Sequence, residues 1–256
     1  MENYKVYIDA GHGGYDNGAT YNGRLEKDDN LRLAMAVGKS LRERGIDTDF
    51  TRVTDIYQSP NEKAQIANDN GADLLISFHR SSSPVPNTYE GVESYIYNTG
   101  DVKERIANNI NSALENLGFK NLGVDVRKNL AVLRKTKMPA ILVDVGFINT
   151  NSDNELFDQK FNEIAQAIAD AIEKSLKEEN VNIPNVTYAI QVGLFRNVEN
   201  ATNLQNLLQN DHIDTRIQPM GGLYAVLVGR YRTIAEAQKQ EDELNNMGYE
   251  TIVIEV

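Results

Sequence analysis

The 256-residue chain contains no cysteine and no tryptophan, and its only histidines are His12, His79 and His212. Without cysteine, the chain cannot form a disulfide framework or a thiolate metal site. Any bound metal must therefore be held by histidine, aspartate and glutamate side chains. Because the chain has only three histidines, a metal site that uses two of them can draw on only three possible pairs.

Positive charge is also scarce. The chain has 26 lysines and arginines against 37 aspartates and glutamates, which gives a net charge of −11 and a pI near 4.8. This balance argues against a nucleic-acid partner, because such a partner needs a basic surface that displaces phosphate counterions.

Long apolar runs are missing as well. No run approaches the ~20 residues that span a bilayer, so we expect no integral membrane segment. The first residues, MENYKVYIDAG, lack the basic and apolar regions of a secretory signal. We therefore expect a protein that is made in the cytoplasm without a signal peptide and that acts on an extracellular substrate only after release or lysis.

Strand-like and helix-like patterns alternate from residue 4 to about residue 178. Short apolar stretches predict buried strands, and apolar residues at spacings of three and four predict amphipathic helices. This alternation is typical of an α/β domain, here residues 1–178, in which helices flank a mixed, mostly parallel sheet. Sites in such sheets form at the carboxyl ends of strands. The predicted strands cover residues 4–8, 48–51, 74–78, 92–97 and 141–147, and the predicted helices cover about 28–44, 61–70, 101–117 and 156–177.

The alternation lapses after residue 178. Residues 179–187 are polar with a central Pro184 and predict a linker. The rest of the chain contains an internal repeat, because YAIQVGLFRNVENA at 188–201 aligns with YAVLVGRYRTIAEA at 224–237. Each copy continues into a helical segment and then a strand. The repeat therefore predicts a small α+β domain over residues 188–256, with two helices on one face of its sheet.

Two of the histidines lie where predicted strands end. VYIDAGHGG leads from a strand into a glycine-rich loop that carries His12, and LLISFHRSSS is a strand that ends near His79. Glu26, which precedes the first predicted helix, completes the His₂Glu ligand set of a hydrolytic zinc site with an open fourth position for water. Each residue also has a plainer interpretation: a surface turn for His12, a charged helix start for Glu26, and a single hydrogen bond for His79.

Asp144 lies in the middle of the apolar stretch ILVDVGF. A carboxylate is costly to bury there without a partner. A hydrolytic zinc site needs a general base outside its ligand set, and Asp144 is the obvious candidate. The alternative is a structural carboxylate that accepts hydrogen bonds from backbone amides.

Taken in order, these motifs resemble the zinc-dependent N-acetylmuramoyl-L-alanine amidases of the sporulation and phage-lysis type. The resemblance spans residues 4–175 and is carried by DAGHGG, LEKDDNL, ADLLISFHRSSS, GVESYIYN and LAVLRKTKMPAILVDVGFINT. It implies that His12, Glu26 and His79 are zinc ligands and that position 144 carries the catalytic carboxylate. It also implies that the enzyme hydrolyses the amide bond between N-acetylmuramic acid and the L-alanine of the peptidoglycan stem peptide.

The chain departs from the family pattern at two positions. The family's usual residue at position 144 is glutamate, and Asp144 is one methylene shorter. A general base must come within roughly 2.6–3.2 Å of the proton that it takes, so the shorter side chain raises the alternative of reduced activity. Arg80 follows His79, where the family often has a small residue. Arg80 either binds a carboxylate of the substrate as a fork or is solvated, and the weak pairing of most surface arginines favours solvation.

The C-terminal repeat resembles the SPOR domains of bacterial cell-wall and division proteins, through YAIQVGLF and YAVLVGRY. This resemblance implies a ferredoxin-like βαββαβ domain that binds peptidoglycan glycan strands. Strand alternation predicts that Ile190 and Val192 face the helices, whereas Gln191 and Leu227 face the open side of the sheet as candidate substrate-binding residues. We reject an RNA-binding use of this architecture, because the sheet lacks RNP-type aromatic residues and the segment is acidic. His212 is expected to be a solvated loop residue.

These observations predict a two-domain peptidoglycan hydrolase that uses zinc. It is either a phage endolysin or a sporulation or lysis autolysin, and the compact two-domain organisation of the chain favours the endolysin. Two alternatives stay open. One is a glycan-binding cell-wall protein whose turnover is impaired by Asp144, and the other is a zinc endopeptidase that cuts stem peptides.

Overall fold

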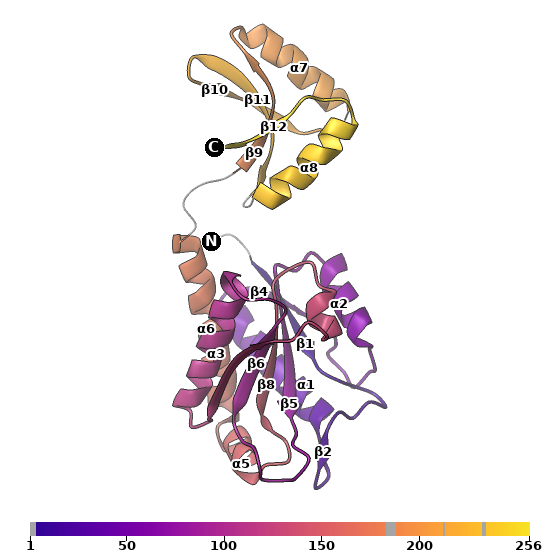
Figure 1. Cartoon of the computed structure of the whole chain (residues 1–256), viewed down its shortest axis with the longest axis vertical. Helices are drawn as coiled ribbons and strands as arrows, with labels where there is room; N and C mark the ends of the chain where they lie inside the picture. Colours follow the sequence, from indigo (N-terminus) through magenta and orange to yellow (C-terminus); the bar gives the residue numbers. More distant parts are fainter. Residues whose placement is uncertain (1–3, 183–187, 212, 232–233) are drawn as a thin grey trace. The chain divides into compact units, whose positions relative to one another are not determined.

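The structure is a computed structural model, and its contacts divide the chain into two units, residues 1–180 and 181–256 (Figure 1). Each unit is described by itself. His212 and part of the predicted linker lie outside the described residues. The described residues are 4–182, 188–211, 213–231 and 234–256. Among them, none of the helices is long and apolar enough to cross a bilayer.

The N-terminal unit is built on a six-stranded mixed sheet. The strands of this sheet are β1 (Lys5–Ala10), β4 (Asp47–Phe50), β5 (Leu74–Ser81), β6 (Val92–Ile96), β7 (Asn121–Val126) and β8 (Ala140–Phe147). A separate two-stranded hairpin is formed by β2 (Thr20–Tyr21) and β3 (Arg24–Leu25). The sheet has the order β4-β1-β5-β8-β6-β7. Strands β4, β1, β5 and β8 run parallel, whereas β6 pairs antiparallel with β8, and β7 runs parallel to β6. The predicted mixed, mostly parallel sheet is confirmed, although β7 and the hairpin were not predicted.

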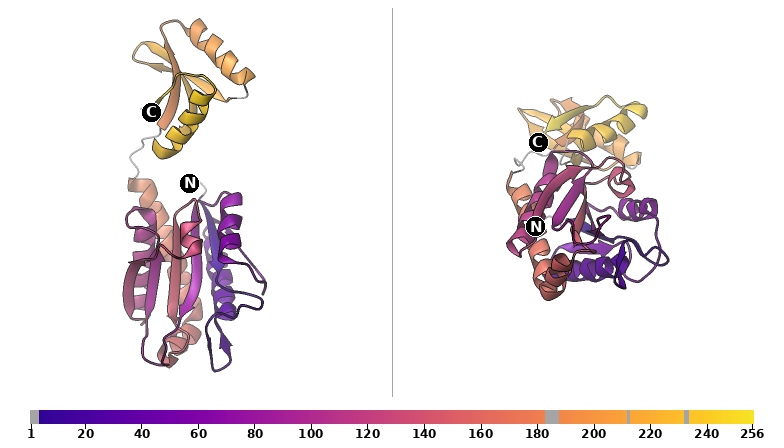
Figure 2. Two further views of the ribbon diagram at one scale, coloured as in Figure 1. Left: turned by 45° about the vertical axis from the view of Figure 1, so that its right-hand side comes forward. Right: turned by 60° about the horizontal axis from the view of Figure 1, so that its bottom comes forward.

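Helices cover both faces of this sheet, as Figures 1 and 2 show. The helices are α1 (Glu26–Glu43), α2 (Pro60–Asp69), α3 (Asp101–Asn116), α4 (Ala131–Arg134), α5 (Asn151–Gln159) and α6 (Phe161–Asn182). The larger core lies under α1, α3 and α6, and it contains Val6 and Ile8 of β1. Tyr7 points to the other face, where it packs with Ala67 of α2 and Val132 of α4. We call this second face the α2/α4 face.

Two predicted helix boundaries are wrong. α1 begins at Glu26 itself, with Leu25 as its N-cap residue, so Glu26 lies inside the helix and not before it. The single helix predicted for residues 156–177 is two helices, because the chain leaves the helical path at Lys160, where φ is −109°. The second of these helices, α6, continues to Asn182 and so extends into the predicted linker.

The C-terminal unit has the predicted βαββαβ order. Its elements are β9 (Tyr188–Phe195), α7 (Val198–Asn210), β10 (Thr215–Met220), β11 (Leu223–Tyr231), α8 (Ile234–Asn246) and β12 (Ile252–Glu255). The four strands form an antiparallel sheet with the order β10-β11-β9-β12. Ile190 packs with Leu244 of α8, and Val192 packs with Leu204 of α7, so both residues face the helices as predicted.

Leu227 lies on the opposite face of this sheet, beside its register partner Gln191, as strand alternation predicted. The side chain of Leu227 is nevertheless 0% exposed, because it packs with Ala225 and with Met220 and Ile254 from other strands of the sheet. The prediction that Leu227 binds substrate is therefore wrong. Gln191 is only half-buried, so a ligand can reach it.

Candidate metal centre and active site

Three titratable side chains from separate elements meet at the carboxyl ends of β1 and β5. His12 lies in the loop after β1, Glu26 is the first residue of α1, and His79 lies near the end of β5. Glu26 Oε1 is 3.2 Å from His12 Nε2 and 2.9 Å from His79 Nδ1. Each of the three residues offers one ligand atom, and these atoms lie within 4.8 Å of one another. The structure thus brings together all three residues that the sequence predicted as metal ligands.

The spacing of these three atoms fits a metal ion. Zinc bonds of about 2.0–2.2 Å in a tetrahedral site place ligand atoms roughly 3.3–3.5 Å apart. The two distances from Glu26 Oε1 are only slightly shorter than this. Two imidazoles and one carboxylate are also the donor set of catalytic zinc sites with an open fourth position. The group of residues can therefore hold a metal ion.

The loop after β1 needs glycine because the ligands approach its backbone closely. A Cβ atom on Gly11 would lie 2.2 Å from Cε1 of His79, and a Cβ atom on Gly18 would lie 2.5 Å from Oε2 of Glu26. His12 itself has a φ of 60°, in the left-handed region that few non-glycine residues adopt. The backbone is thus shaped to aim His12 at Glu26, and strained backbone of this kind is typical of functional sites.

A second layer of hydrogen bonds orients the three candidate ligands. Nδ1 of His12 donates to Asp16 Oδ2 at 2.8 Å, which leaves Nε2 of the same ring free to bind a metal. Glu26 Oε2 accepts the backbone N–H of Ala19 at 2.8 Å, and Glu26 Oε1 accepts the side-chain amide of Asn30 at 3.2 Å. Sequence reasoning missed Asp16 and Asn30 in this role, although Asp16 lies four residues after His12 in the same loop.

The histidines and carboxylates of the site stabilise each other's charged forms. Burial lowers the pKa of His12, but the hydrogen bonds and charges of Glu26 and Asp16 outweigh burial and raise that pKa to about 9. Burial raises the pKa of Glu26, but the hydrogen bonds from His12 and His79 reverse this effect and hold the pKa far below its usual range. At neutral pH the metal-free protein therefore carries a proton on His12, in the place that a metal ion would take.

Asp144 is the register partner of His79 on the neighbouring strand β8. Burial raises the pKa of Asp144 to about 6. The negative charges of Glu26 and Glu93 add to this increase, whereas the positive charges of His79 and Arg80 oppose it. In the part of the chain that the structure describes, no hydrogen bond reaches the Asp144 carboxylate from a backbone amide. The alternative, a structural carboxylate that accepts hydrogen bonds from backbone amides, is therefore not supported. A buried carboxyl group with a pKa near neutrality is suited to accepting and donating a proton.

A second carboxylate lies beside Asp144, and sequence reasoning missed it. Glu93 on β6 is the register partner of Asp144 and accepts a hydrogen bond from the hydroxyl group of Tyr95 at 2.6 Å. Glu93 and Tyr95 are two residues apart on one strand, so both side chains point to the α2/α4 face. His79, Asp144 and Glu93 consequently form a row across three neighbouring strands.

Arg80 contradicts both of its predicted interpretations. Its side chain is 0% exposed, so it is neither solvated nor available to a substrate. Nη1 donates to Asp29 at 2.6 Å and Nη2 donates to Asn154 at 2.8 Å, while the guanidinium group lies 4.3 Å from the centre of the Phe157 ring. The reason is strand alternation, because the residue after His79 points to the opposite face of the sheet. Arg80 is a structural residue that joins α1 to α5.

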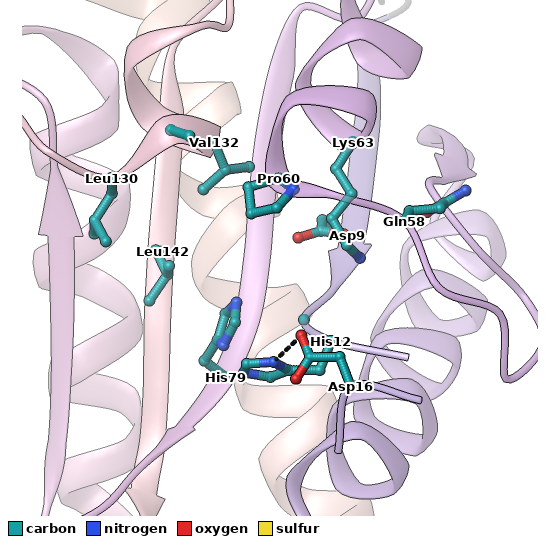
Figure 3. A pocket seen from close by; sticks show the side chains of 12 residues that line it. Asp9, His12, Asp16, Gln58, Pro60, Lys63, His79, Leu130, Val132 and Leu142 are labelled. Atoms are coloured by element: carbon teal, nitrogen blue, oxygen red, sulfur yellow. Dashed lines mark hydrogen bonds and ion pairs between the residues drawn. The ribbon is translucent and has the colours of Figure 1, made fainter. Parts of the chain in front are cut away.

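The candidate metal centre opens into a cavity of about 150 Å³ on the α2/α4 face. Figure 3 shows His12, His79 and Asp16 at one end of this cavity, with Leu130 and Leu142 on one side. A buried ion pair forms the other side. The cavity thus combines polar groups that converge on one point with an apolar wall, which is the usual composition of a small-molecule site.

The ion pair joins Lys63 of α2 to Asp9 of β1, with Nζ 2.7 Å from Oδ1. Asp9 also accepts hydrogen bonds from Thr51 and Ser77, each at 2.6 Å. Lys63 donates a further bond to the backbone carbonyl of Ala10 at 2.6 Å. These contacts fix the strand end from which the His12 loop departs, and no sequence pattern had indicated them.

Residues 6–174 match the protein family described as N-acetylmuramoyl-L-alanine amidase, and residues 184–255 match the SPOR domain. A sporulation-specific N-acetylmuramoyl-L-alanine amidase of Bacillus subtilis (strain 168) is 34% identical over 206 residues, which cover 78% of this chain and 78% of the relative. An endolysin of Bacillus phage SPP1 is 33% identical over 181 residues, which cover 67% of this chain and 65% of the relative.

Solved structures give the same result for the N-terminal unit. The crystal structure of an N-acetylmuramoyl-L-alanine amidase from Clostridium difficile 630 is 31% identical, with a TM-score of 0.66, and the match covers 70% of this chain and 100% of that structure. An N-acetylmuramoyl-L-alanine amidase, AmiC2, of Nostoc punctiforme is 32% identical with a TM-score of 0.63, and the match covers 68% of this chain and 97% of that structure. The chain therefore belongs to the N-acetylmuramoyl-L-alanine amidase family and carries a C-terminal SPOR domain.

Proposed function

We propose that the chain is a zinc-dependent peptidoglycan hydrolase that cleaves the amide bond between N-acetylmuramic acid and the L-alanine of the stem peptide. The convergence of His12, Glu26 and His79 on Glu26 Oε1, at 3.2 and 2.9 Å, is the observation that carries this proposal. The donor set and its spacing fit zinc, and membership of the amidase family gives the class of reaction.

Zinc bound by these three residues would act as a Lewis acid that lowers the pKa of a water molecule and polarises the lactyl carbonyl group of the substrate. The side chains of the protein do the rest of the work. Asp16 fixes the ring of His12 so that Nε2 points into the site. Asp144 accepts the proton of the attacking water and then gives it to the amine nitrogen of the departing L-alanine. The apolar wall of Leu130 and Leu142 limits the access of bulk water to this proton transfer.

The C-terminal unit would hold the enzyme on the wall. We infer that its open sheet face binds glycan strands, with the half-buried Gln191 as a contact. Tethering of this kind raises the local concentration of substrate near the catalytic domain without any new contact in the active site.

A digest of purified cell walls tests the proposed function. The full chain, loaded with zinc, is expected to release intact stem peptides that begin with L-alanine, and mass spectrometry identifies these products. Fragments cut within the stem peptide or its cross-bridge would instead assign an endopeptidase. Binding to walls without any release of peptide would favour the impaired glycan-binding protein that the short side chain of Asp144 suggests.

Metal analysis tests the ligand set separately. The purified chain is expected to hold one zinc ion, and His79→Ala is expected to lose it. If the variant keeps its zinc, the ligand assignment is wrong whatever the digest shows.

A further inference from the structure

One segment of the catalytic unit departs from the acidic character of the chain. The chain has a net charge of −11, yet residues 126–143 contain no aspartate and no glutamate. Residues 127–137, which we call the basic segment, carry five exposed basic side chains. These are Arg127, Lys128, Arg134, Lys135 and Lys137.

Most of these charges lack a carboxylate partner within the protein. Arg127 forms an ion pair with Asp125 at 3.1 Å. For the other four side chains, the described ranges contain no ion pair with a carboxylate. Lys27, Lys63 and Arg80 of the same unit, in contrast, each contact a carboxylate at 2.6–2.7 Å. Positive charges that no carboxylate neutralises create a positive local potential, so this surface attracts anionic ligands.

The basic segment also forms a wall of the active-site cavity. Leu130, Ala131 and Val132 line the cavity of about 150 Å³ that contains His12 and His79. Figure 3 shows Leu130 and Val132 on the side of the cavity away from Asp9 and Lys63. A substrate that occupies this cavity must therefore lie against the segment.

The next residues of the segment line a second cavity, of about 270 Å³. Arg134 and Lys137 contribute to its lining, together with Tyr97 and Pro139. Ala131 and Arg134 are three positions apart in α4, so their side chains are neighbours, with Cβ atoms about 5–6 Å apart. The apolar wall of the active-site cavity is thus directly continued by cationic groups.

A peptide with free carboxylates fits this arrangement. A stem peptide continues from L-alanine through a γ-linked glutamyl residue, whose α-carboxylate is free unless it is amidated, to a free carboxyl terminus. An extended peptide advances about 3.3–3.6 Å per residue, so the carboxylates two or three residues beyond the scissile amide lie roughly 7–11 Å away from it. Arginine binds such groups with two parallel N–H···O bonds, and lysine binds them as a point charge.

We propose that the basic segment binds the free carboxylates of the stem peptide and so makes the catalytic unit select anionic stem peptides over amidated ones. This inference rests on the proposed function, because it takes the scissile amide to lie at the metal centre. Arg134 is the main contact, since it is adjacent to the cavity wall, and Lys137 extends the same surface. The remaining cations attract anionic substrate from solution and are screened by salt.

Steady-state kinetics on two soluble muropeptides test the proposal. The two substrates differ only in the second residue of the stem peptide, which carries a free α-carboxylate in one and an amide in the other. The full chain is expected to have a KM about 5-fold lower for the carboxylate form, as one charged contact near the protein surface gives. Arg134→Gln is expected to remove this preference by raising KM for the carboxylate form alone, with kcat unchanged. Lys39→Gln, an exposed cation on α1 with 78% of its side chain accessible, is the matched control and should keep the preference.

A binding measurement separates this inference from the proposed function. Calorimetric titration of the free stem peptides into the full chain reports recognition even if no substrate is cleaved. Tighter binding of the carboxylate peptide that is lost in Arg134→Gln supports the inference under either outcome of the digest. Equal affinity for the two peptides would overturn it. Tighter binding of a glycerol-phosphate polymer than of either peptide, lost in the same variant, would also overturn it and assign the segment to phosphate polymers.

Discussion

Zinc binding to the site formed by His12, Glu26 and His79 is expected to release about one proton per ion near pH 7 and about half a proton at pH 9. The proton comes from His12, whose pKa in the metal-free protein is raised to about 9, since Glu26 and Asp16 outweigh the effect of burial. Glu26 contributes none, because the same contacts hold its pKa far below neutrality. A metal ligand must be neutral imidazole or carboxylate, so the proton on His12 competes directly with the ion.

The magnitude follows from the distance between the pH and this pKa. At pH 7 the protonated form of His12 outnumbers the neutral form by about 100 to 1. The apparent affinity for zinc at pH 7 is therefore about 100-fold below its limiting value. The sign is fixed, since protons oppose the metal: affinity rises about tenfold per pH unit from pH 7 and levels off above about pH 9.

Competition with a chromophoric chelator from pH 7 to pH 9.5 measures this slope, and calorimetry in two buffers with different ionisation enthalpies counts the protons. Asp16→Asn removes one of the two carboxylates that raise the pKa of His12, so the plateau should move to lower pH. The limiting affinity of this variant should fall about 10–100-fold, as for other residues that orient a ligand. Glu43→Gln, a surface carboxylate on α1 with 58% of its side chain exposed, is the control and should behave as the parent chain does. An affinity that does not change with pH, with no proton released, would refute the assignment of His12 as a protonated ligand.

Three further predictions concern the residues around the site. Asp144→Asn should lower the rate of wall hydrolysis about 10²–10⁴-fold without loss of zinc, whereas Asp144→Glu should retain or raise it; an unchanged rate in the asparagine variant would remove Asp144 from the mechanism. Gly11→Ala places a Cβ atom 2.2 Å from Cε1 of His79, so the purified variant should fold by circular dichroism but contain less zinc, and full zinc occupancy would contradict the crowding. Lys63→Met leaves Asp9 buried without its cation and should lower the free energy of unfolding in urea by about 3–5 kcal/mol. A decrease of less than about 1 kcal/mol in that variant would show that Thr51 and Ser77 alone satisfy Asp9.

The sequence predicted the candidate ligands because the two histidines carry a local signal and the resemblance to amidases then selected Glu26. A short apolar strand followed by glycine and histidine places His12 at a strand end, and His79 follows the same logic on β5. Parallel strands bring their carboxyl ends to one edge, so residues far apart in sequence meet there. The position of Glu26 was less local, since it was expected before the helix and in fact opens it.

The errors at Arg80 and Leu227 have a common physical origin. The exposure of each side chain is set by residues from other elements that cover it, and not by the sequence of its own strand. Arg80 was judged as a surface residue, yet its carboxylate partner Asp29 lies 51 positions earlier in the chain. Leu227 was placed on the correct face, but its cover comes from Met220 and Ile254 on other strands. Neither contact follows from periodicity along a single element. The alternation rule would have separated Arg80 from His79, since adjacent strand residues point to opposite faces.

The candidate site of the catalytic unit lies on one face of its sheet because the two faces are covered unequally. The helices α1, α3 and α6 are 18, 16 and 22 residues long, and they seal one face with a continuous apolar core. On the other face, α2 and α4 have only 10 and 4 residues. The α2/α4 face is the thinly covered one, and it is there that His79, Asp144 and Glu93 form their row across three strands. Asp144 is buried in this row, and burial raises the pKa of its carboxyl group to about 6. Its register partner His79 is only half-buried and lines the cavity. The thin cover of this face thus leaves a buried carboxyl group beside a histidine that a substrate can reach.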